Sequence, residues 1–161
     1  MEVAFVIAKT SEQFAEGRKL FEEYAASLNF NLCFQGFTEE LNQLDQQYNA
    51  PTGALIVAYA HTIAVAAVGI RKFEPHKAEL KRMYTKPEYR GRKIGQKLLN
   101  KAIHLATELG YEQLLLDTLP EMKAAITLYE EAGFIITEPY RFNPFDTAIY
   151  MVKDLVPLNK I

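Results

Sequence analysis

Apolar residues recur along the chain with two different periods, and each period predicts a different kind of element. Short runs of apolar and β-branched residues predict strands, whereas apolar residues three or four positions apart predict amphipathic helices. The clearest short runs lie on both sides of His61-Thr62, which we expect to be the turn of a hairpin. The pattern predicts strands over residues 3–8, 54–60, 63–73, 78–85, 112–118, 134–136 and 148–152.

Helices are predicted where apolar side chains share one face and polar residues can cap the first turn. Thr10 and Gln13 fit a capping box before a helix that runs to about Leu28. A longer helix, Ile94 to Leu109, carries a second apolar face and ends at Gly110. A short helix is expected over 38–44, and a last one, carrying Ile126 and Tyr129, between a second capping box at Thr118-Leu119-Pro120-Glu121 and Gly133.

The order of these elements predicts the fold class. They follow one another as β-α-α-β-β-β-α-β-α-β-β, which indicates one mixed sheet with helices on its faces, an α/β (α+β) fold. The chain of 161 residues suits one domain with its own core, and no repeat or flexible linker divides it. We therefore expect residues 1–161 to form a single domain.

The composition of the chain argues against several classes of function. The formal net charge is −2, so no overall positive field draws the chain to nucleic acid or to an anionic membrane. The single cysteine, Cys33, excludes a disulfide within the chain and is expected to pack as an apolar residue. No signal peptide is recognised at the start, and the longest apolar run is too short to span a bilayer, so we expect a cytoplasmic protein.

The sequence lacks the residue spacings that define the common nucleotide-binding and hydrolase motifs. The sequence contains neither the phosphate-binding loop of nucleotide hydrolases nor the glycine pattern of dinucleotide-binding folds. Its two serines, Ser11 and Ser27, both fall in the first helix, which excludes a serine-hydrolase elbow. The three histidines, His61, His76 and His104, have no metal-ligand spacing, so no metal site is expected.

A basic, glycine-containing loop precedes the long helix and is the most informative local feature. Two glycines, Gly91 and Gly95, let the main chain approach a ligand closely. The helix start behind them offers free N–H groups, and Arg90, Arg92 and Lys93 add positive charge. This chemistry suits a pyrophosphate, although a solvated basic loop fits the same residues equally well.

The surrounding segments decide between these readings, because residues 79–134 resemble the GNAT superfamily of acetyl-coenzyme-A-dependent N-acetyltransferases. Their signature, Gln/Arg-x-x-Gly-x-Gly/Ala, reads Arg90-Gly91-Arg92-Lys93-Ile94-Gly95 here, with Lys93 in place of the first glycine. The strand 79–85 lies where the family binds pantetheine, and 125–134 is similar to the family element Ala-x-x-Leu-Tyr-x-x-x-Gly-Phe. Met122 replaces an asparagine often found before that element.

The resemblance implies a mostly antiparallel mixed sheet and transfer of an acetyl group from acetyl-CoA to an amine. It assigns acceptor binding to residues 1–75, the acetyl-CoA-binding core to 76–136 and the last strands to 137–161. The main-chain groups of Met83 and Thr85 would pair with pantetheine. The implied cofactor-binding residues are Met83, Tyr84, Thr85, Arg90, Gly91, Arg92, Lys93, Ile94, Gly95, Gln96 and Tyr129.

Two catalytic roles follow from the same resemblance. Tyr129 matches the tyrosine that protonates the departing thiolate, although a core aromatic on an amphipathic helix fits the same position. Glu79 matches the general base of the histone-modifying members, and strand alternation would place it on one face with Lys81 and Met83. Its alternative role is a paired charge at a strand end. A main-chain N–H of the Met83 strand would bind the oxyanion.

The acceptor is expected to be a small-molecule amine or an amino acid, and the protein to be a monomer or a homodimer. The candidate walls of the acceptor site are Phe30, Phe34, Phe37, Tyr48, Arg71 and Tyr140-Arg141-Phe142-Asn143. Protein lysines or N-termini are alternative acceptors. A non-catalytic acyl-CoA sensor of the same fold is the alternative function, favoured by the departures at Lys93 and Met122. No nucleic-acid or membrane partner is expected.

Overall fold

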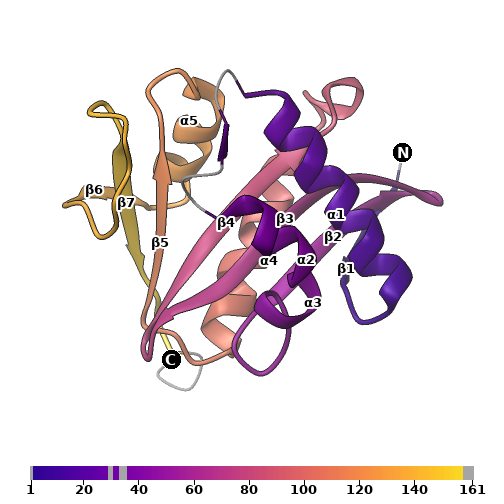
Figure 1. Ribbon diagram of the computed structural model, residues 1–161, viewed down its shortest axis with the longest axis horizontal. Helices are drawn as coiled ribbons and strands as arrows, with labels where there is room; N and C mark the ends of the chain where they lie inside the picture. Colours follow the sequence, from indigo (N-terminus) through magenta and orange to yellow (C-terminus); the bar gives the residue numbers. More distant parts are fainter. Residues whose placement is uncertain (1, 29–30, 33–35, 158–161) are drawn as a thin grey trace.

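The computed structural model describes residues 2–28, 31–32 and 36–157 of the chain, which form one seven-stranded sheet with helices (Figure 1). The predicted Cys33, Phe30 and Phe34 lie outside the described residues. The elements are β1 (Val3–Ile7), α1 (Ser11–Ala26), α2 (Phe37–Asn42), α3 (Leu44–Gln47), β2 (Ala54–Ala60), β3 (Ile63–Glu74), β4 (Lys77–Thr85), the 3₁₀ turn η2 (Pro87–Tyr89), α4 (Ile94–Glu108), β5 (Gln113–Thr118), α5 (Lys123–Glu131), β6 (Ile135–Thr137) and β7 (Ile149–Asp154).

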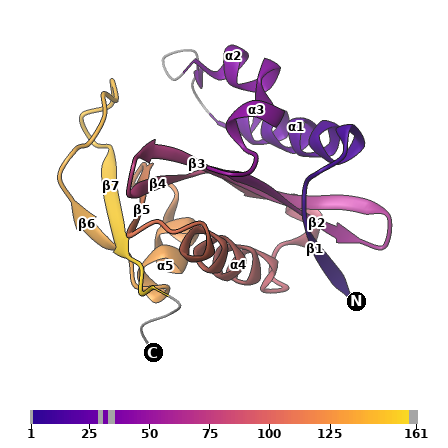
Figure 2. The same cartoon turned by 90° about the horizontal axis from the view of Figure 1, so that it is seen from below.

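The sheet is mixed and mostly antiparallel, as predicted. Its strand order is β1-β2-β3-β4-β5-β7-β6, and β4–β5 is the parallel pair among the six strand pairs of the described residues. Helices α1, α2 and α3 cover one face of the sheet, while α4 and α5 cover the other (Figure 2). None of the described helices is both long and apolar enough to cross a membrane.

The central strands contribute to a core on each face because their side chains alternate. On β2, Ile56 and Ala58 point to the core beneath α4, whereas Leu55 and Val57 point to the core beneath α1. All four side chains are at most 2% exposed. This two-sided burial explains why β2 and β3 read as continuous apolar runs in the sequence.

The first predicted capping box is confirmed and the second is wrong. The Thr10 hydroxyl accepts from the Gln13 N–H at 3.2 Å, and Gln13 Oε1 accepts from the Thr10 N–H at 3.1 Å. Thr118, in contrast, remains the last residue of β5, and its hydroxyl donates to the Met122 sulfur at 3.4 Å. Helix α5 begins only at Lys123 and has no side-chain cap, because Thr118 is held in the sheet.

Two further expectations need correction. The short helix predicted over 38–44 is a pair of helices, α2 and α3, which meet at Gln43, where the backbone leaves the helical region with φ −121°. The last two strands are shifted towards the C-terminus by one or two residues relative to the apolar pattern. The hairpin at His61-Thr62 is confirmed, and His61 adopts the left-handed conformation with φ 57°.

A β-bulge in β4 changes which residues share a face. Gly69 of β3 pairs with Lys81 and Ala67 pairs with Tyr84, so β4 has one more residue than its partner between these pairs. Arg82 lies in this bulge with φ 59°. The predicted shared face of Glu79, Lys81 and Met83 is therefore wrong, because Met83 packs with Leu80 against the α4-side core.

Candidate active site

Strands β4 and β5 pair at one end and separate at the other. Their parallel register covers Lys77↔Gln113, Ala78↔Leu114 and Glu79↔Leu115, and it stops there although both strands continue. Figure 1 shows the two strands close together at one end and apart towards α5. The edge of β4 beyond Glu79 consequently faces an opening instead of a neighbouring strand.

The main-chain groups on this open edge belong to Met83 and Thr85. The Lys86 N–H bonds to the Val65 carbonyl on the β3 side at 2.8 Å, and main-chain groups of successive residues in a strand point to opposite sides. Residues 84 and 86 therefore face β3, which leaves Met83 and Thr85 facing the opening. This is the orientation that pairing with an amide-containing ligand requires.

The loop at the start of α4 holds two residues in the left-handed backbone region, one of which is a lysine. Lys93 has φ 63° and Gly91 has φ 81°, so both residues lie in the left-handed region. Lysine tolerates this region poorly, and the strain there is compatible with a constrained binding loop. The first N–H groups of α4 have no partner inside the helix, so they remain available to an anion.

The predicted loop residues divide into exposed and buried members. Arg90, Gly91, Arg92, Lys93 and Gln96 are exposed, which suits contact with a ligand. Ile94, by contrast, is 3% exposed and belongs to the core. Arg90 Nε donates to the Thr85 carbonyl at 3.0 Å, so this arginine already ties the loop to the open end of β4.

Gly95 serves helix packing as well as ligand approach. A Cβ added there would lie 3.3 Å from Leu128 Cδ1 of α5 and 3.9 Å from the Thr85 hydroxyl oxygen. Both distances place Gly95 at the junction of α4, α5 and the open end of β4. A bulkier residue at this position would therefore press on Leu128 in addition to narrowing the loop.

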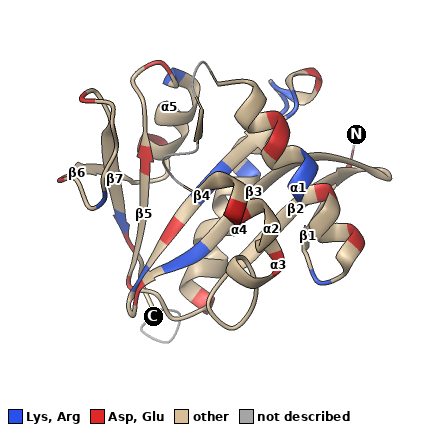
Figure 3. Cartoon of the chain, viewed as in Figure 1, with Lys and Arg blue, Asp and Glu red and all other residues tan. Residues whose placement is uncertain are grey.

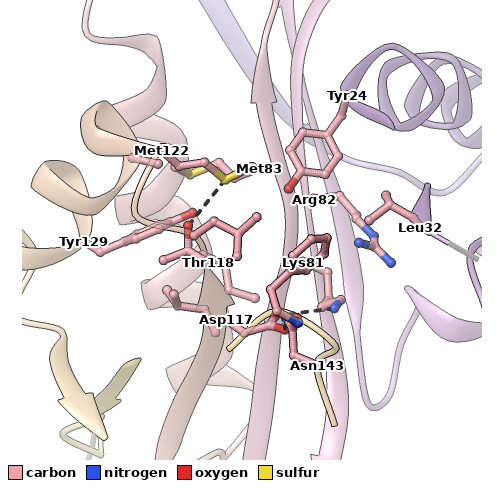
Figure 4. A pocket seen from close by; sticks show the side chains of 15 residues that line it. Tyr24, Leu32, Lys81, Arg82, Met83, Asp117, Thr118, Met122, Tyr129 and Asn143 are labelled. Atoms are coloured by element: carbon pink, nitrogen blue, oxygen red, sulfur yellow. Dashed lines mark hydrogen bonds and ion pairs between the residues drawn. The ribbon is translucent and has the colours of Figure 1, made fainter. Parts of the chain in front are cut away.

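A cavity of about 70 Å³ lies where β4 and β5 have separated (Figure 4). Its apolar lining comes from the core side, with Met83 on β4 and Met122 before α5. Its polar lining comes from α1, β4, β5, α5 and the loop before β7. The lining residues that carry polar side chains are Tyr24, Lys81, Arg82, Asp117, Thr118, Tyr129 and Asn143.

Tyr129 points from α5 into this cavity and is 8% exposed (Figure 4). Its ring packs against Phe134, with the ring centres 5.8 Å apart. Among the described residues, none forms a hydrogen bond with the Tyr129 hydroxyl. Burial raises the pKa of Tyr129, and the nearby charge of Asp117 adds to the shift. The hydroxyl therefore stays protonated at neutral pH.

Glu79 lies next to the cavity but outside its lining. It is fully buried, and its carboxylate accepts hydrogen bonds from Arg141 at 2.7 Å, Tyr140 at 2.9 Å and Arg71 Nε at 3.3 Å. Lys81 Nζ also lies near this carboxylate, 3.8 Å from Glu79 Oε2. These four groups come from β3, β4 and the loop before β7, so Glu79 joins three segments of the chain.

Charged residues also occur along β3, β4 and α2 (Figure 3), where Glu40 of α2 lies close to Arg71 of β3 and Arg82 of β4. Glu40 of α2 accepts from Arg82 Nη2 at 2.9 Å and Nε at 3.1 Å, and from the Tyr48 hydroxyl at 2.9 Å. Glu40 is 1% exposed, and the guanidinium of Arg82 holds its pKa down against the effect of burial. This second ion pair fixes α2 over the bulge in β4.

The predicted acceptor walls are distributed over several places. Asn143 lines the cavity, whereas Arg71 and Arg141 line a separate groove with Gln47 and Phe73. Tyr48 is fully buried in the core and Phe142 is 75% exposed, so neither faces the cavity. Phe37 packs beneath Arg82, 5.2 Å from the guanidinium carbon, and Tyr140 bonds to Glu79.

Sequence reasoning predicted Tyr129 and Asn143 among the polar cavity residues as part of the site, and it missed Tyr24, Lys81, Arg82, Asp117 and Thr118. Lys81 is 3% exposed, and burial lowers its pKa to about 8 while the charges of Glu79 and Asp117 oppose that shift. Asp117 follows Leu114-Leu115-Leu116 in an apolar strand. The charge of Asp117 at the end of this apolar run could have marked it as a candidate site residue, because a buried carboxylate needs a partner or a function.

Comparison with known proteins agrees with this geometry. Residues 18–134 match the Acetyltransferase (GNAT) family. An uncharacterised N-acetyltransferase of Schizosaccharomyces pombe is 34% identical over 151 residues, which cover 92% of this chain and 93% of that protein. The chain belongs to the GNAT acetyltransferase family.

Solved structures share the fold. A GNAT-family acetyltransferase of Staphylococcus aureus superposes with a TM-score of 0.77 at 20% identity, covering 96% of this chain and all of that one. A Salmonella typhimurium acetyltransferase solved with acetyl-CoA gives a TM-score of 0.72 at 15% identity, covering 97% of this chain and 95% of that one. At these identities the likeness defines the fold class, which is as predicted.

Proposed function

We propose that the protein transfers the acetyl group of acetyl-CoA to a primary amine of a small molecule or an amino acid. The observation that carries this proposal is the open edge of β4, which runs from the start of α4 to the cavity that contains Tyr129. A long ligand with a charged end and a reactive end fits such a path. The Salmonella typhimurium neighbour was solved with acetyl-CoA.

The chain offers a separate group for each part of coenzyme A. The N–H groups at the start of α4, with Arg90 and Arg92 beside them, would hold the pyrophosphate. Main-chain groups of Met83 and Thr85 would pair with the two amides of pantetheine. The thioester would then lie in the cavity, in reach of the Tyr129 hydroxyl.

The chemistry needs an acid for the leaving thiolate and a neutral amine for the attack. Tyr129 supports the acid role, because its hydroxyl is protonated, lines the cavity and has no other partner among the described residues. The amine attacks directly, and an N–H on the open edge of β4 would bind the oxyanion. A covalent enzyme intermediate is not part of this proposal.

The geometry supports Glu79 less well as the general base. Its carboxylate accepts three hydrogen bonds, lies beside Lys81 and is outside the cavity lining. A base must reach the proton that it removes, at about 2.6–3.2 Å or through one water. Glu79 does not meet that requirement in this structure, because Arg71, Tyr140 and Arg141 occupy its carboxylate and would have to move first.

Calorimetry with acetyl-CoA, followed by a turnover assay against a panel of amines, tests this function. We expect micromolar affinity for acetyl-CoA, much weaker binding of ATP or NAD, and release of free coenzyme A with at least one primary amine. Absence of acetyl-CoA binding at millimolar concentration would refute the proposal. Tight binding without turnover of any amine would instead favour the non-catalytic sensor.

A further inference from the structure

We propose that Asp117 binds the acceptor amine and takes its proton during acetyl transfer, a role that rests on the proposed function. Asp117 lies on β5 two residues beyond Leu115, where the pairing with β4 has ended. Its side chain is 6% exposed and lines the cavity together with that of Tyr129. The site thus has a buried carboxylate at the end of the path that would deliver the thioester.

The Asp117 carboxylate has unused capacity to accept hydrogen bonds. Within the described part of the chain, it accepts one hydrogen bond, from Asn143 Nδ2 at 3.3 Å. Lys81 Nζ lies 3.9 Å from its other oxygen, at the outer limit of an ion pair. A carboxylate offers about four lone-pair positions, so a primary amine or ammonium can donate to Asp117 without displacing Asn143.

Groups from several elements face this carboxylate. Lys81 approaches from β4 and Asn143 from the loop before β7. Burial raises the pKa of four tyrosines near Asp117, two of which line the cavity, and the Asp117 charge adds to each of these shifts. The four are Tyr24, Tyr129, Tyr140 and Tyr150. Asp117 is therefore a negative charge close to both tyrosines that line the cavity, Tyr24 and Tyr129.

Lys81 is the positive charge next to Asp117. It lies between two carboxylates, 3.8 Å from Glu79 and 3.9 Å from Asp117. Burial lowers its pKa to about 8. While Lys81 is charged it competes with the substrate ammonium for Asp117, and above pH 8 that competition weakens.

The transfer balances with the groups present. The neutral amine nitrogen attacks the thioester carbon, the new N–C bond forms, and the carbonyl electrons move to oxygen. The nitrogen then loses one proton to the Asp117 carboxylate. The carbonyl re-forms, the C–S bond breaks with its electrons on sulfur, and the thiolate takes one proton from Tyr129. Asp117 returns its proton to solvent and Tyr129 regains one, so an amide and free coenzyme A are the products.

Asp117→Asn tests this role, because it keeps the size of the side chain and removes its ability to take a proton. With acetyl-CoA and a panel of primary amines, we expect kcat to fall about 100-fold or more. The acetyl-CoA affinity and the melting temperature should stay close to those of the wild type. Asn143→Ala is the matched control, since it removes the hydrogen bond to Asp117 but leaves the carboxylate, and we expect a loss of only a few-fold.

A binding measurement separates this inference from the proposed function. The coenzyme-A-bound protein is titrated with butylamine and followed by NMR, which needs no turnover. We expect shifts at the cavity residues in the wild type and their loss in Asp117→Asn. A wild type that acetylates no amine would refute the proposed function alone. An Asp117→Asn variant that binds butylamine as the wild type does, or keeps kcat within about threefold, overturns the role of Asp117.

Discussion

Glu79 and Asp117 are carboxylates on neighbouring strands, and their surroundings differ because β4 and β5 pair at one end only. Glu79 lies in the paired half, where it accepts from three donors and is fully buried. Asp117 lies in the separated half, where it lines a cavity and accepts one hydrogen bond among the described residues. Strand separation thus gives two carboxylates on neighbouring strands different surroundings, and the proposed reactive role falls to the one in the separated half.

The same comparison applies to the two ends of β4. At its paired end, side chains of β4 hold segments of the chain together. At its open end, the main-chain groups of Met83 and Thr85 are not paired with β5. The β-bulge at Arg82 lies between these ends and shifts the alternation by one residue. It directs Met83 towards the α4-side core while Lys81 stays with the carboxylates.

The largest expected effect concerns Glu79. Glu79→Gln leaves Arg71, Arg141 and Lys81 with one negative charge fewer in a buried network. Removing one partner of a buried ion pair costs about 3–5 kcal/mol, so the free energy of unfolding measured with urea should fall by that order. A variant with nearly unchanged stability but strongly reduced kcat would contradict a structural role and restore Glu79 as the base.

The next effect concerns Tyr129. Tyr129→Phe removes a hydroxyl that has no hydrogen-bond partner among the described residues, so the melting temperature should change little. If the hydroxyl protonates the thiolate, kcat should fall about 100-fold, the lower end for a general acid, while coenzyme A still binds. Steady-state kinetics and a melting curve on the same variant decide the matter. Unchanged kcat with a lowered melting temperature would make Tyr129 a core residue only.

A smaller effect is expected from the titration of Lys81. Its pKa is lowered to about 8 in the folded protein, whereas an unfolded lysine titrates near about 10.4. Between these values the unfolded state binds more protons, so stability rises with pH, by about 1 kcal/mol from pH 7 to pH 9. Urea denaturation of the wild type and of Lys81→Met across this window should differ by that gain. Equal pH dependence in both would contradict the buried, charged Lys81.

A further prediction compares two glycines that share a backbone conformation. Gly91 before α4 has φ +81°, Gly110 after it has φ +92°, and an added Cβ would meet nothing within 4 Å at either position. Alanine at each should cost about 1–2 kcal/mol of stability. Only Gly91→Ala should also weaken acetyl-CoA binding in calorimetry, because only Gly91 lies in the proposed pyrophosphate loop. Equal affinities in the two variants would place the pyrophosphate elsewhere.

Much of the fold follows from local sequence signals. The apolar runs of β2 and β3 and the capping box at Thr10 predict elements that the structure contains, because burial and capping act at the positions concerned. The start of α5 was missed, since Thr118 has two possible uses and the sheet, a nonlocal interaction, retains it. The division into α2 and α3 depends on the backbone at Gln43, which no side-chain pattern indicates.

The candidate site was predictable where it depends on a short motif and unpredictable where it depends on strand geometry. Arg90, Gly91 and Lys93 form one loop at a helix start, and the chain order alone places them together. The cavity instead requires β4 to bulge at Arg82 and to leave β5 after Glu79. Neither event has a sequence signature here, so Lys81 and Asp117 were found only in the structure.

Hydrogen–deuterium exchange of the protein with and without acetyl-CoA tests the central claim most directly. The claim is that the open edge of β4 and the start of α4 form one cofactor-binding path. We predict that acetyl-CoA slows exchange at the N–H groups of Met83 and Thr85 and of residues 93–96, while the far edge strand β1 is unchanged. Unchanged exchange over residues 81–85 in the presence of saturating acetyl-CoA would contradict the account.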